Sequence, residues 1–211
     1  ISSDTRILPY FDIPFQSGDN KIIQKMNRVG TKEGYEALIG KIRTNLCDVG
    51  SRDMCLRTTF LCGFPSETNE SALKTQEFLQ NIAPDWSGCF TYSREDDTPA
   101  AKMKGQVSSK IATKRVAELQ DIQSKITQEK LKRHIGQQYT VLVEEIIPDP
   151  EEKVGLAVGR AWFQAPEVDG ACVIRYELDS SKEKNLVKPG NVIQVKVLSV
   201  SGVDLDTVLI S

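Results

Sequence analysis

The sequence predicts an α/β region followed by a small all-β barrel of the OB type. In residues 1–136, strand-like apolar runs alternate with segments whose apolar residues recur every 3.6 positions, which is typical of parallel βαβ units. After Gly136 the apolar period changes to two. The 75 residues that follow hold five short strand-like runs, enough for a closed antiparallel barrel without exposed strand edges. We therefore place the domains at 1–136 and 137–211.

The elements of the first region have clear start and stop signals. The apolar run at 56–62 predicts a strand that ends at Gly63 and Pro65, and the next three residues can cap a following helix. Thr31 can cap another helix, whose expected buried face is Tyr35, Leu38, Ile39, Ile42 and Leu46. In order, we expect a strand at 7–15, a short helix after 16–19, a helix from 31, a strand at 56–62, a helix at 70–82, a strand at 88–92 and a helix at 108–134.

The second region is expected to form strands at 139–144, 154–163, 171–176, 192–200 and 205–210, with turns at 148–150, 170, 189–190 and 202–204. Trp162 and Phe163 are adjacent in one of these strands, so one of the two must face the core. The lone histidine, His134, lies at a basic helix end, where a cation opposes the helix dipole favourably. We expect it on the surface.

The composition is that of a globular protein. No apolar run approaches the roughly 18 residues that a membrane span needs, and no leader opens the chain, so we expect no membrane association. Five irregularly spaced cysteines indicate reduced thiols and a cytoplasmic location. Because the first residue is Ile1, we expect a fragment of something longer.

The charge is unevenly divided between the two regions. Residues 1–136 hold 20 Lys and Arg against 17 Asp and Glu, whereas residues 137–211 hold 7 against 12. A region with a balance of −5 repels a phosphate backbone and suits a basic protein partner. RNA binding by the second region is therefore not expected, although OB-type barrels often bind RNA.

Four strings occur in an order that resembles the second half of a radical-SAM methylthiotransferase barrel. The second region is similar to the TRAM domain that ends those enzymes. The resemblance implies a fold consisting of the C-terminal half of a radical-SAM, TIM-like barrel followed by a small OB-like TRAM barrel. The strings are residues 14–18, residues 26–31, residues 57–68, and residues 92–95 with 98–100.

One further string resembles a particular branch of this family. Residues 165–170, Ala-Pro-Glu-Val-Asp-Gly, are similar to the RimO-like enzymes that methylthiolate an aspartate of a small-subunit ribosomal protein. The tRNA-adenosine branch usually has a different string there and an aspartate in place of Thr59. The resemblance therefore implies a ribosomal protein as substrate. A tRNA-adenosine methylthiotransferase and a non-catalytic RNA- or protein-binding adaptor stay open as alternatives.

The resemblance also implies S-adenosylmethionine and two 4Fe–4S clusters in the intact enzyme. The family holds the first cluster with three cysteines spaced Cys-x3-Cys-x2-Cys, and no cysteines here have that spacing. The cluster ligands are thus expected to be absent from this chain, along with any catalytic or metal-binding residue. We expect the fragment alone to be inactive and, with a truncated barrel edge at 7–15, to self-associate.

The resemblance points to candidate binding residues, each with an alternative role. Gln16 and Ser17 could reach a ribose or methionine group, or only cap a helix. Arg57 could meet a carboxylate, or form a surface ion pair. Gly63 and Phe64 could approach an adenine, although Gly63 also suits a tight turn. The candidate cofactor-binding residues are Gln16, Ser17, Arg57, Thr59, Gly63 and Phe64, and the candidate substrate-binding residues are Arg160, Glu167 and Asp169.

Overall fold

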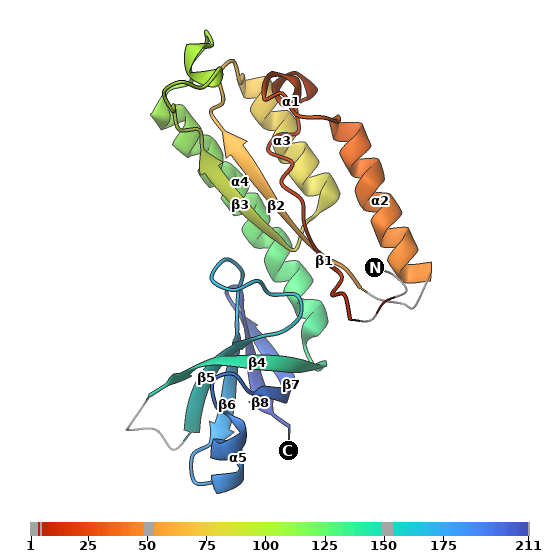
Figure 1. Ribbon diagram of the computed structural model, residues 1–211, viewed down its shortest axis with the longest axis vertical. Helices are drawn as coiled ribbons and strands as arrows, with labels where there is room; N and C mark the ends of the chain where they lie inside the picture. Colours follow the sequence, from red (N-terminus) through yellow and green to blue (C-terminus); the bar gives the residue numbers. More distant parts are fainter. Residues whose placement is uncertain (1–3, 5, 49–52, 149–153, 211) are drawn as a thin grey trace. The chain divides into compact units, whose positions relative to one another are not determined.

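The computed structural model describes residues 4, 6–48, 53–148 and 154–210. It divides into two units, Ile1–Ile126 and Thr127–Ser211, and each contains its own β-sheet (Figure 1). Among the described helices, none combines the length and the apolar character needed to cross a membrane. Most of the turn predicted at 148–150 lies outside the described residues.

The first unit is built on a parallel sheet with the order β1-β2-β3. Its helices follow the strands in sequence, which confirms the predicted α/β alternation. The strands are β1 (Tyr10–Asp12), β2 (Cys55–Cys62) and β3 (Trp86–Thr91). The helices are α1 (Asn20–Lys25), α2 (Lys32–Asp48), α3 (Asn69–Ile82) and α4 (Ser109–Leu131), with a 3₁₀ turn at Ala100–Lys102. The last residues of α4 and a further 3₁₀ turn at Lys132–His134 fall in the second unit.

The helix starts of this unit follow from local capping chemistry. The Asp19 carboxylate accepts a hydrogen bond from the Lys21 amide at 2.7 Å and caps α1. Thr68 Oγ1 accepts from the Ser71 amide at 3.1 Å and caps α3. Each cap satisfies an amide that has no carbonyl partner within its helix.

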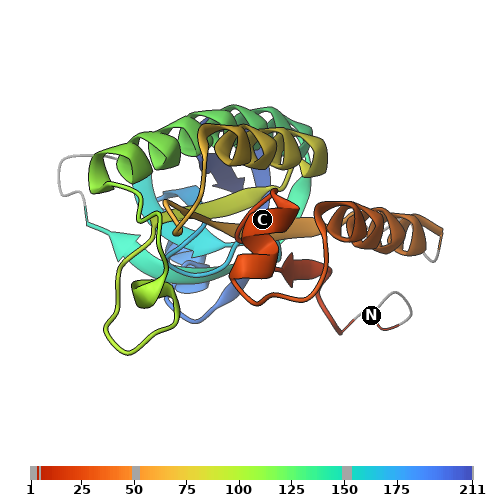
Figure 2. The ribbon, with the colours of Figure 1, turned by 90° about the horizontal axis from the view of Figure 1, so that it is seen from above.

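The two faces of β2 have different surroundings. Leu56, Phe60 and Cys62 alternate along one face and belong to the core that packs against α2, α3 and α4. Figure 2 shows α3 and α4 lying together along β2 and β3. Thr59 and Leu61 alternate along the opposite face and are only partly buried. The sheet is therefore covered by helices on one face.

Two sequence predictions for this unit are corrected. The strand expected at 7–15 covers only Tyr10–Asp12, and Phe11 and Ile13 pack against the core instead of extending an exposed apolar edge. Leu38, expected on the buried face of α2, is 43% exposed, because it lies one position before the fully buried Ile39 and therefore turns away from the core.

The second unit contains a closed five-stranded barrel with the order β4-β5-β6-β8-β7 (Figure 1). Closure is as predicted, but β6 and β8 pair in parallel, so the barrel is not wholly antiparallel. The strand expected at 154–163 ends at Arg160, and a short helix, α5 (Ser181–Leu186), was not expected. The strands are β4 (Gln138–Ile147), β5 (Val154–Arg160), β6 (Cys172–Glu177), β7 (Val192–Ser201) and β8 (Asp204–Leu209).

The prediction that His134 lies on the surface is wrong. The residue is 4% exposed, and its ring stacks on Phe163 with a centroid distance of 4.1 Å and an interplanar angle of 8°. Its Nδ1 lies 2.6 Å from the hydroxyl of Tyr139. Of the adjacent aromatic pair, Phe163 faces the core at 2% exposure, whereas Trp162 is half-buried.

Candidate functional site

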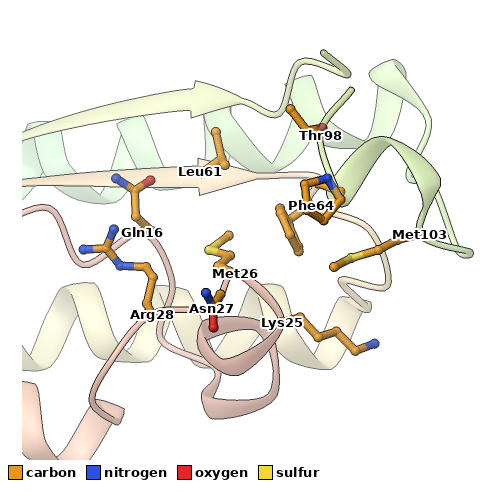
Figure 3. A pocket seen from close by; sticks show the side chains of 11 residues that line it. Gln16, Lys25, Met26, Asn27, Arg28, Leu61, Phe64, Thr98 and Met103 are labelled. Carbon is orange, nitrogen blue, oxygen red and sulfur yellow. The ribbon is translucent and has the colours of Figure 1, made fainter. Parts of the chain in front are cut away.

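A pocket of about 330 Å³ lies at the carboxyl end of β2 (Figure 3). Ligands of α/β proteins commonly bind at this end of the strands. The lining is mostly apolar with a few polar groups: Gln16, Lys25, Met26, Asn27, Arg28, Leu61, Phe64, Thr98, Pro99, Ala100 and Met103. In Figure 3, Gln16 and Arg28 lie at one side of the pocket, and Phe64 and Met103 lie at the other.

Gln16 occupies the pocket wall in an unusual backbone conformation. Its φ is +71°, in the left-handed region that non-glycine residues rarely adopt. Its amide donates to the carbonyl oxygen of Thr59 at 2.8 Å, and its own carbonyl oxygen accepts from the Leu61 amide at 3.0 Å. These two bonds with β2 hold the backbone in place while the side chain lines the pocket.

Phe64 lies on the opposite wall and is 6% exposed. Its ring meets Tyr92 edge to face, with centroids 5.4 Å apart and a 72° angle. An aromatic wall fixed in this way can cover the face of a flat ring. Gln16 and Phe64 are thus the two predicted cofactor-binding residues that the structure brings together around one pocket.

Several pocket residues were not among the predicted site residues. Met26, Asn27 and Arg28 follow α1, and the Arg28 guanidinium donates to the carbonyl oxygen of Pro14. Thr98 and Met103 come from the segment after β3. The sequence contained a signal for most of these pocket residues, because residues 26–31 and 98–100 belong to the strings that carry the family resemblance.

Ser17 and Gly63 lie beside the pocket but do not line it. Ser17 is 2% exposed, and its hydroxyl lies 3.3 Å from that of Thr75 and accepts from the Asp19 amide at 3.1 Å. Gly63 has a φ of +83°, and a Cβ there would lie 2.5 Å from Ala112 Cβ on α4. Its amide donates to the buried carboxylate of Glu67. Both positions have clear structural roles.

Arg57 and Thr59 lie on the partly buried face of β2, outside the pocket lining. The Arg57 guanidinium forms an ion pair with Asp12 of β1 at 2.8 Å. The exposed fraction of the Arg57 side chain is 14%, so the pair is not a fully solvated one. Thr59 contributes its carbonyl oxygen to the Gln16 turn.

The described free cysteines are Cys55, Cys62, Cys89 and Cys172, and all four are buried. Cys62 is on β2, Cys89 on β3 and Cys172 on β6, and burial raises the pKa of both Cys62 and Cys172 to about 12. Iron–sulfur clusters are held by closely spaced cysteine thiolates. Within the described residues, no group of three or more His, Cys, Asp or Glu side chains is placed to hold a metal ion.

The predicted substrate-binding residues gather around the loop between β5 and β6. Arg160 Nε donates to the Glu144 carboxylate at 2.6 Å. Asp169 accepts a hydrogen bond from the Ala165 amide at 2.8 Å and so closes the loop on itself. Glu167 is exposed at the tip between them, with a φ of +66°.

Comparison with known proteins supports both parts of the resemblance. Residues 135–210 match the family model described as TRAM domain. A protein of Treponema denticola named ribosomal protein uS12 methylthiotransferase RimO is 47% identical over 213 aligned residues, which cover 100% of this chain and 45% of the relative. Proteins with the same name from Pseudothermotoga lettingae and Lachnoclostridium phytofermentans are 38% and 33% identical, covering 83% and 97% of this chain and 38% and 43% of the relatives. The chain therefore spans less than half the length of these relatives.

Proposed function

We propose that this chain, which belongs to the RimO family of methylthiotransferases, forms part of the S-adenosylmethionine site and supplies the substrate-recognition barrel of a ribosomal-protein aspartate methylthiotransferase. The observation that carries the proposal is the 47% identity over the whole chain to a relative of that name. The pocket at the end of β2 and the TRAM match at residues 135–210 support the two roles separately.

We infer that the first region is the C-terminal half of a TIM-like barrel and that the domain boundary lies at 136–138. Three parallel strands with helices along one face match the layering of part of such a barrel. The opposite face of the sheet is only partly covered, and Phe90 on β3 is 56% exposed. Parallel sheets in intact proteins are covered on both faces, so further strands would be expected to enclose this one.

The pocket has the chemistry that an adenosyl group needs. Phe64 and the two methionines offer flat and polarizable apolar surface, and Gln16 and Asn27 offer side-chain donors and acceptors. When bound, S-adenosylmethionine supplies the carbon radical and the methyl group of the reaction. The role of this chain is to bind and orient that molecule and to exclude water from it.

The cysteines whose side chains the structure describes do not fit an iron–sulfur cluster. Cys62 on β2 and Cys89 on β3 are buried in the helix-covered core, and Cys172 belongs to the barrel. A raised thiol pKa also opposes the thiolate form that iron requires. We therefore assign cluster binding to a part of the protein other than these residues, and we expect this chain alone to be inactive.

The barrel is proposed to bind the protein substrate rather than RNA. Residues 137–211 carry a charge balance of −5, which favours a basic ribosomal protein over a phosphate backbone. The relatives are named for ribosomal protein uS12. The tRNA-directed and adaptor functions are alternatives that the following experiment separates.

The decisive experiment measures binding and modification together. The 211-residue chain should bind purified uS12 more tightly than tRNA at physiological salt, and the affinity for uS12 should fall as salt rises. The longer protein that contains this chain, reconstituted anaerobically, should transfer a methylthio group to an aspartate of uS12, detected by mass spectrometry. Tighter binding of tRNA and methylthiolation of tRNA adenosine would refute the proposal in favour of the tRNA branch. Binding without any modification would favour an adaptor.

The assignment of the pocket at the end of β2 to S-adenosylmethionine is tested by a substitution of Gln16. Gln16→Gly keeps the left-handed backbone, which glycine adopts readily, but removes the side-chain amide. In the longer protein it should weaken S-adenosylmethionine binding without lowering thermal stability. Val29→Ala is the matched control, since Val29 is 96% exposed and does not line the pocket. Unchanged cofactor affinity in the Gln16 variant would remove Gln16 from the site.

A further inference from the structure

We propose that residues 161–171, here called the docking loop, form a rigid element in which Glu167 contacts a basic segment of the protein substrate. We further propose that His134 and Phe163 are positioning residues that hold this loop in its binding conformation. The inference rests on the proposed function, in which the barrel binds a ribosomal protein, and it identifies the surface and the residues responsible.

The docking loop is fixed at its start by a buried glutamine. Gln164 is 3% exposed, and its side-chain oxygen accepts hydrogen bonds from the Ala161 amide at 2.9 Å and from the Cys172 thiol at 3.3 Å. The backbone N–H of Gln164 donates to the backbone carbonyl oxygen of Ala161 at 3.1 Å. The first turn of the loop is therefore tied both to itself and to β6.

The far end of the docking loop is fixed just as closely. The Asp169 carboxylate accepts from the Ala165 amide at 2.8 Å, and the Ala171 amide donates to the Asp204 carboxylate at 2.8 Å. A Cβ at Gly170 would lie 1.9 Å from the Val203 carbonyl oxygen, so only glycine fits there. A loop held at both ends loses little conformational freedom on binding, which favours affinity.

The exposed tip between these ends carries a residue in a costly conformation. Glu167 has a φ of +66° and, among the described residues of this unit, is the one non-glycine residue in the left-handed region. Glycine and asparagine adopt this conformation more readily than glutamate. Backbone strain held by a rigid surrounding is characteristic of functional sites. We infer that the position keeps a glutamate because its carboxylate is used.

Glu167 differs from the two other predicted substrate-binding residues, whose side chains are engaged within the protein. Asp169 is engaged in closing the loop, and Arg160 is paired with Glu144 on β4. Glu167 is exposed and lies beside Val168, which is 58% exposed. The tip therefore offers one carboxylate next to an apolar side chain, which suits a basic segment with an alkyl stem, such as a lysine or arginine side chain.

The positioning residues act through a ring stack beneath the loop. Phe163 stacks on the parallel ring of His134, with centroids 4.1 Å apart, and meets Tyr139 in a T-shaped contact at 5.1 Å. His134 is in turn oriented by the Tyr139 hydroxyl at 2.6 Å from Nδ1. Neither positioning residue is exposed enough to meet the substrate, since both are at least 96% buried. Their effect on binding would pass through the docking loop.

The contact is tested with the 211-residue chain and purified uS12 as the probe. Glu167→Gln should weaken binding about three- to fivefold, as expected for one exposed charge contact, and should reduce the dependence of affinity on salt. Glu167→Gly should weaken binding to the same extent or more while leaving thermal stability equal or higher, because glycine relieves the strain. Asp179→Asn removes an exposed carboxylate elsewhere on the barrel and is the matched control.

The positioning role is tested by a pair of substitutions at one residue. His134→Ala removes the ring stack and should weaken uS12 binding, whereas His134→Phe keeps a flat ring and should restore it. Hydrogen exchange at β4 and β7 reports whether the barrel itself stays folded. If His134 only stabilised the fold, a loss of uS12 affinity would be accompanied by faster hydrogen exchange at β4 and β7. A positioning role predicts lower affinity for His134→Ala than for His134→Phe while exchange at β4 and β7 is the same in both.

The outcomes distinguish this inference from the proposed function. If the unaltered chain does not bind uS12, the proposed function fails. If the unaltered chain binds uS12 and both Glu167 variants bind it as tightly as the unaltered chain does, the docking-loop contact is wrong while the proposed function stands. If His134→Phe binds as weakly as His134→Ala, or if His134→Ala binds normally, the positioning role is wrong.

Discussion

A buried ion pair joins α4 to the loop that follows β2, and its removal gives the sharpest test of the first unit. Arg115 Nη1 lies 2.9 Å from the Glu67 carboxylate, and the two side chains are 8% and 4% exposed. Arg115 also donates to the Glu67 carbonyl oxygen at 3.3 Å and to the Asn69 side-chain oxygen at 2.9 Å. Glu67 receives a further bond from the Gly63 amide. The pair thus fixes the turn next to Phe64.

Arg115→Met should cost about 3–5 kcal/mol at neutral pH, because it leaves the Glu67 carboxylate buried without its cation. Burial already raises the pKa of Glu67, and Arg115 is among the groups that oppose this rise. In the variant the pKa of Glu67 should rise further. The Glu67→Gln, Arg115→Met double variant removes the buried charge as well and should be considerably more stable than Arg115→Met alone.

The sign of the pH dependence follows from the raised pKa. Between the unfolded pKa of about 4.3 and the higher folded value, the folded variant binds more protons at Glu67 than the unfolded chain does. Its stability should therefore fall as pH rises through this window and recover at acidic pH. The loss relative to the unaltered chain should be larger at pH 7.5 than at pH 5.

Hydrogen exchange measures this loss separately in each unit. A cost of about 3 kcal/mol corresponds to roughly a hundredfold lower protection of β2 amides, with β7 amides as the internal reference. Lys114→Met is the matched control, because Lys114 is 78% exposed and pairs only at the surface with Glu118. A loss below about 1 kcal/mol, or an equal loss at both pH values, would refute the view that Glu67 is a buried, ionised group held by Arg115.

Three further outcomes are expected. After anaerobic reconstitution the chain should bind no iron, and about four irons per chain with iron–sulfur absorbance would contradict this. Cys62 and Cys172, whose pKa values are raised to about 12 by burial, should react with a thiol reagent at pH 8 only after unfolding, and rapid labelling of the folded chain would contradict their burial. Light scattering over a dilution series should show concentration-dependent self-association, because the sheet face with Phe90 is only partly covered, whereas a strict monomer would contradict it.

Much of the fold could be predicted because its elements depend on local patterns. The helix caps at Thr31 and Thr68 act within three residues, and the sequence shows both. The change of apolar period after Gly136 marked the start of the barrel, because a barrel strand buries alternate residues. The parallel pairing of β6 with β8 could not be seen, since these strands are joined by no local turn and their contact depends on closure of the whole barrel.

The burial of His134 was missed for a similar reason. Its neighbours in sequence are basic and favour a helix end at the surface, which is correct for Lys132 and Arg133. The ring partner Phe163 lies 29 positions away, and no periodic pattern connects the two. Ser17 differs from its prediction in the opposite way. Its polar side chain next to Gln16 predicts a ligand contact, but the Thr75 hydroxyl and the Asp19 backbone amide engage its hydroxyl.

The candidate sites share one property that sequence patterns do not reveal. Gln16 in the pocket wall and Glu167 at the loop tip both hold a left-handed backbone, although glycine would adopt it at lower cost. Each is kept there by hydrogen bonds made by its surroundings: with β2 at Gln16, and within the docking loop around Glu167. A turn signal in the sequence indicates where the chain reverses, but not which side chain the reversal presents. Ser66, Ala83 and Asp97 also have a positive φ, so the reason to expect function is the strain together with the pocket lining at Gln16 and the exposure of Glu167.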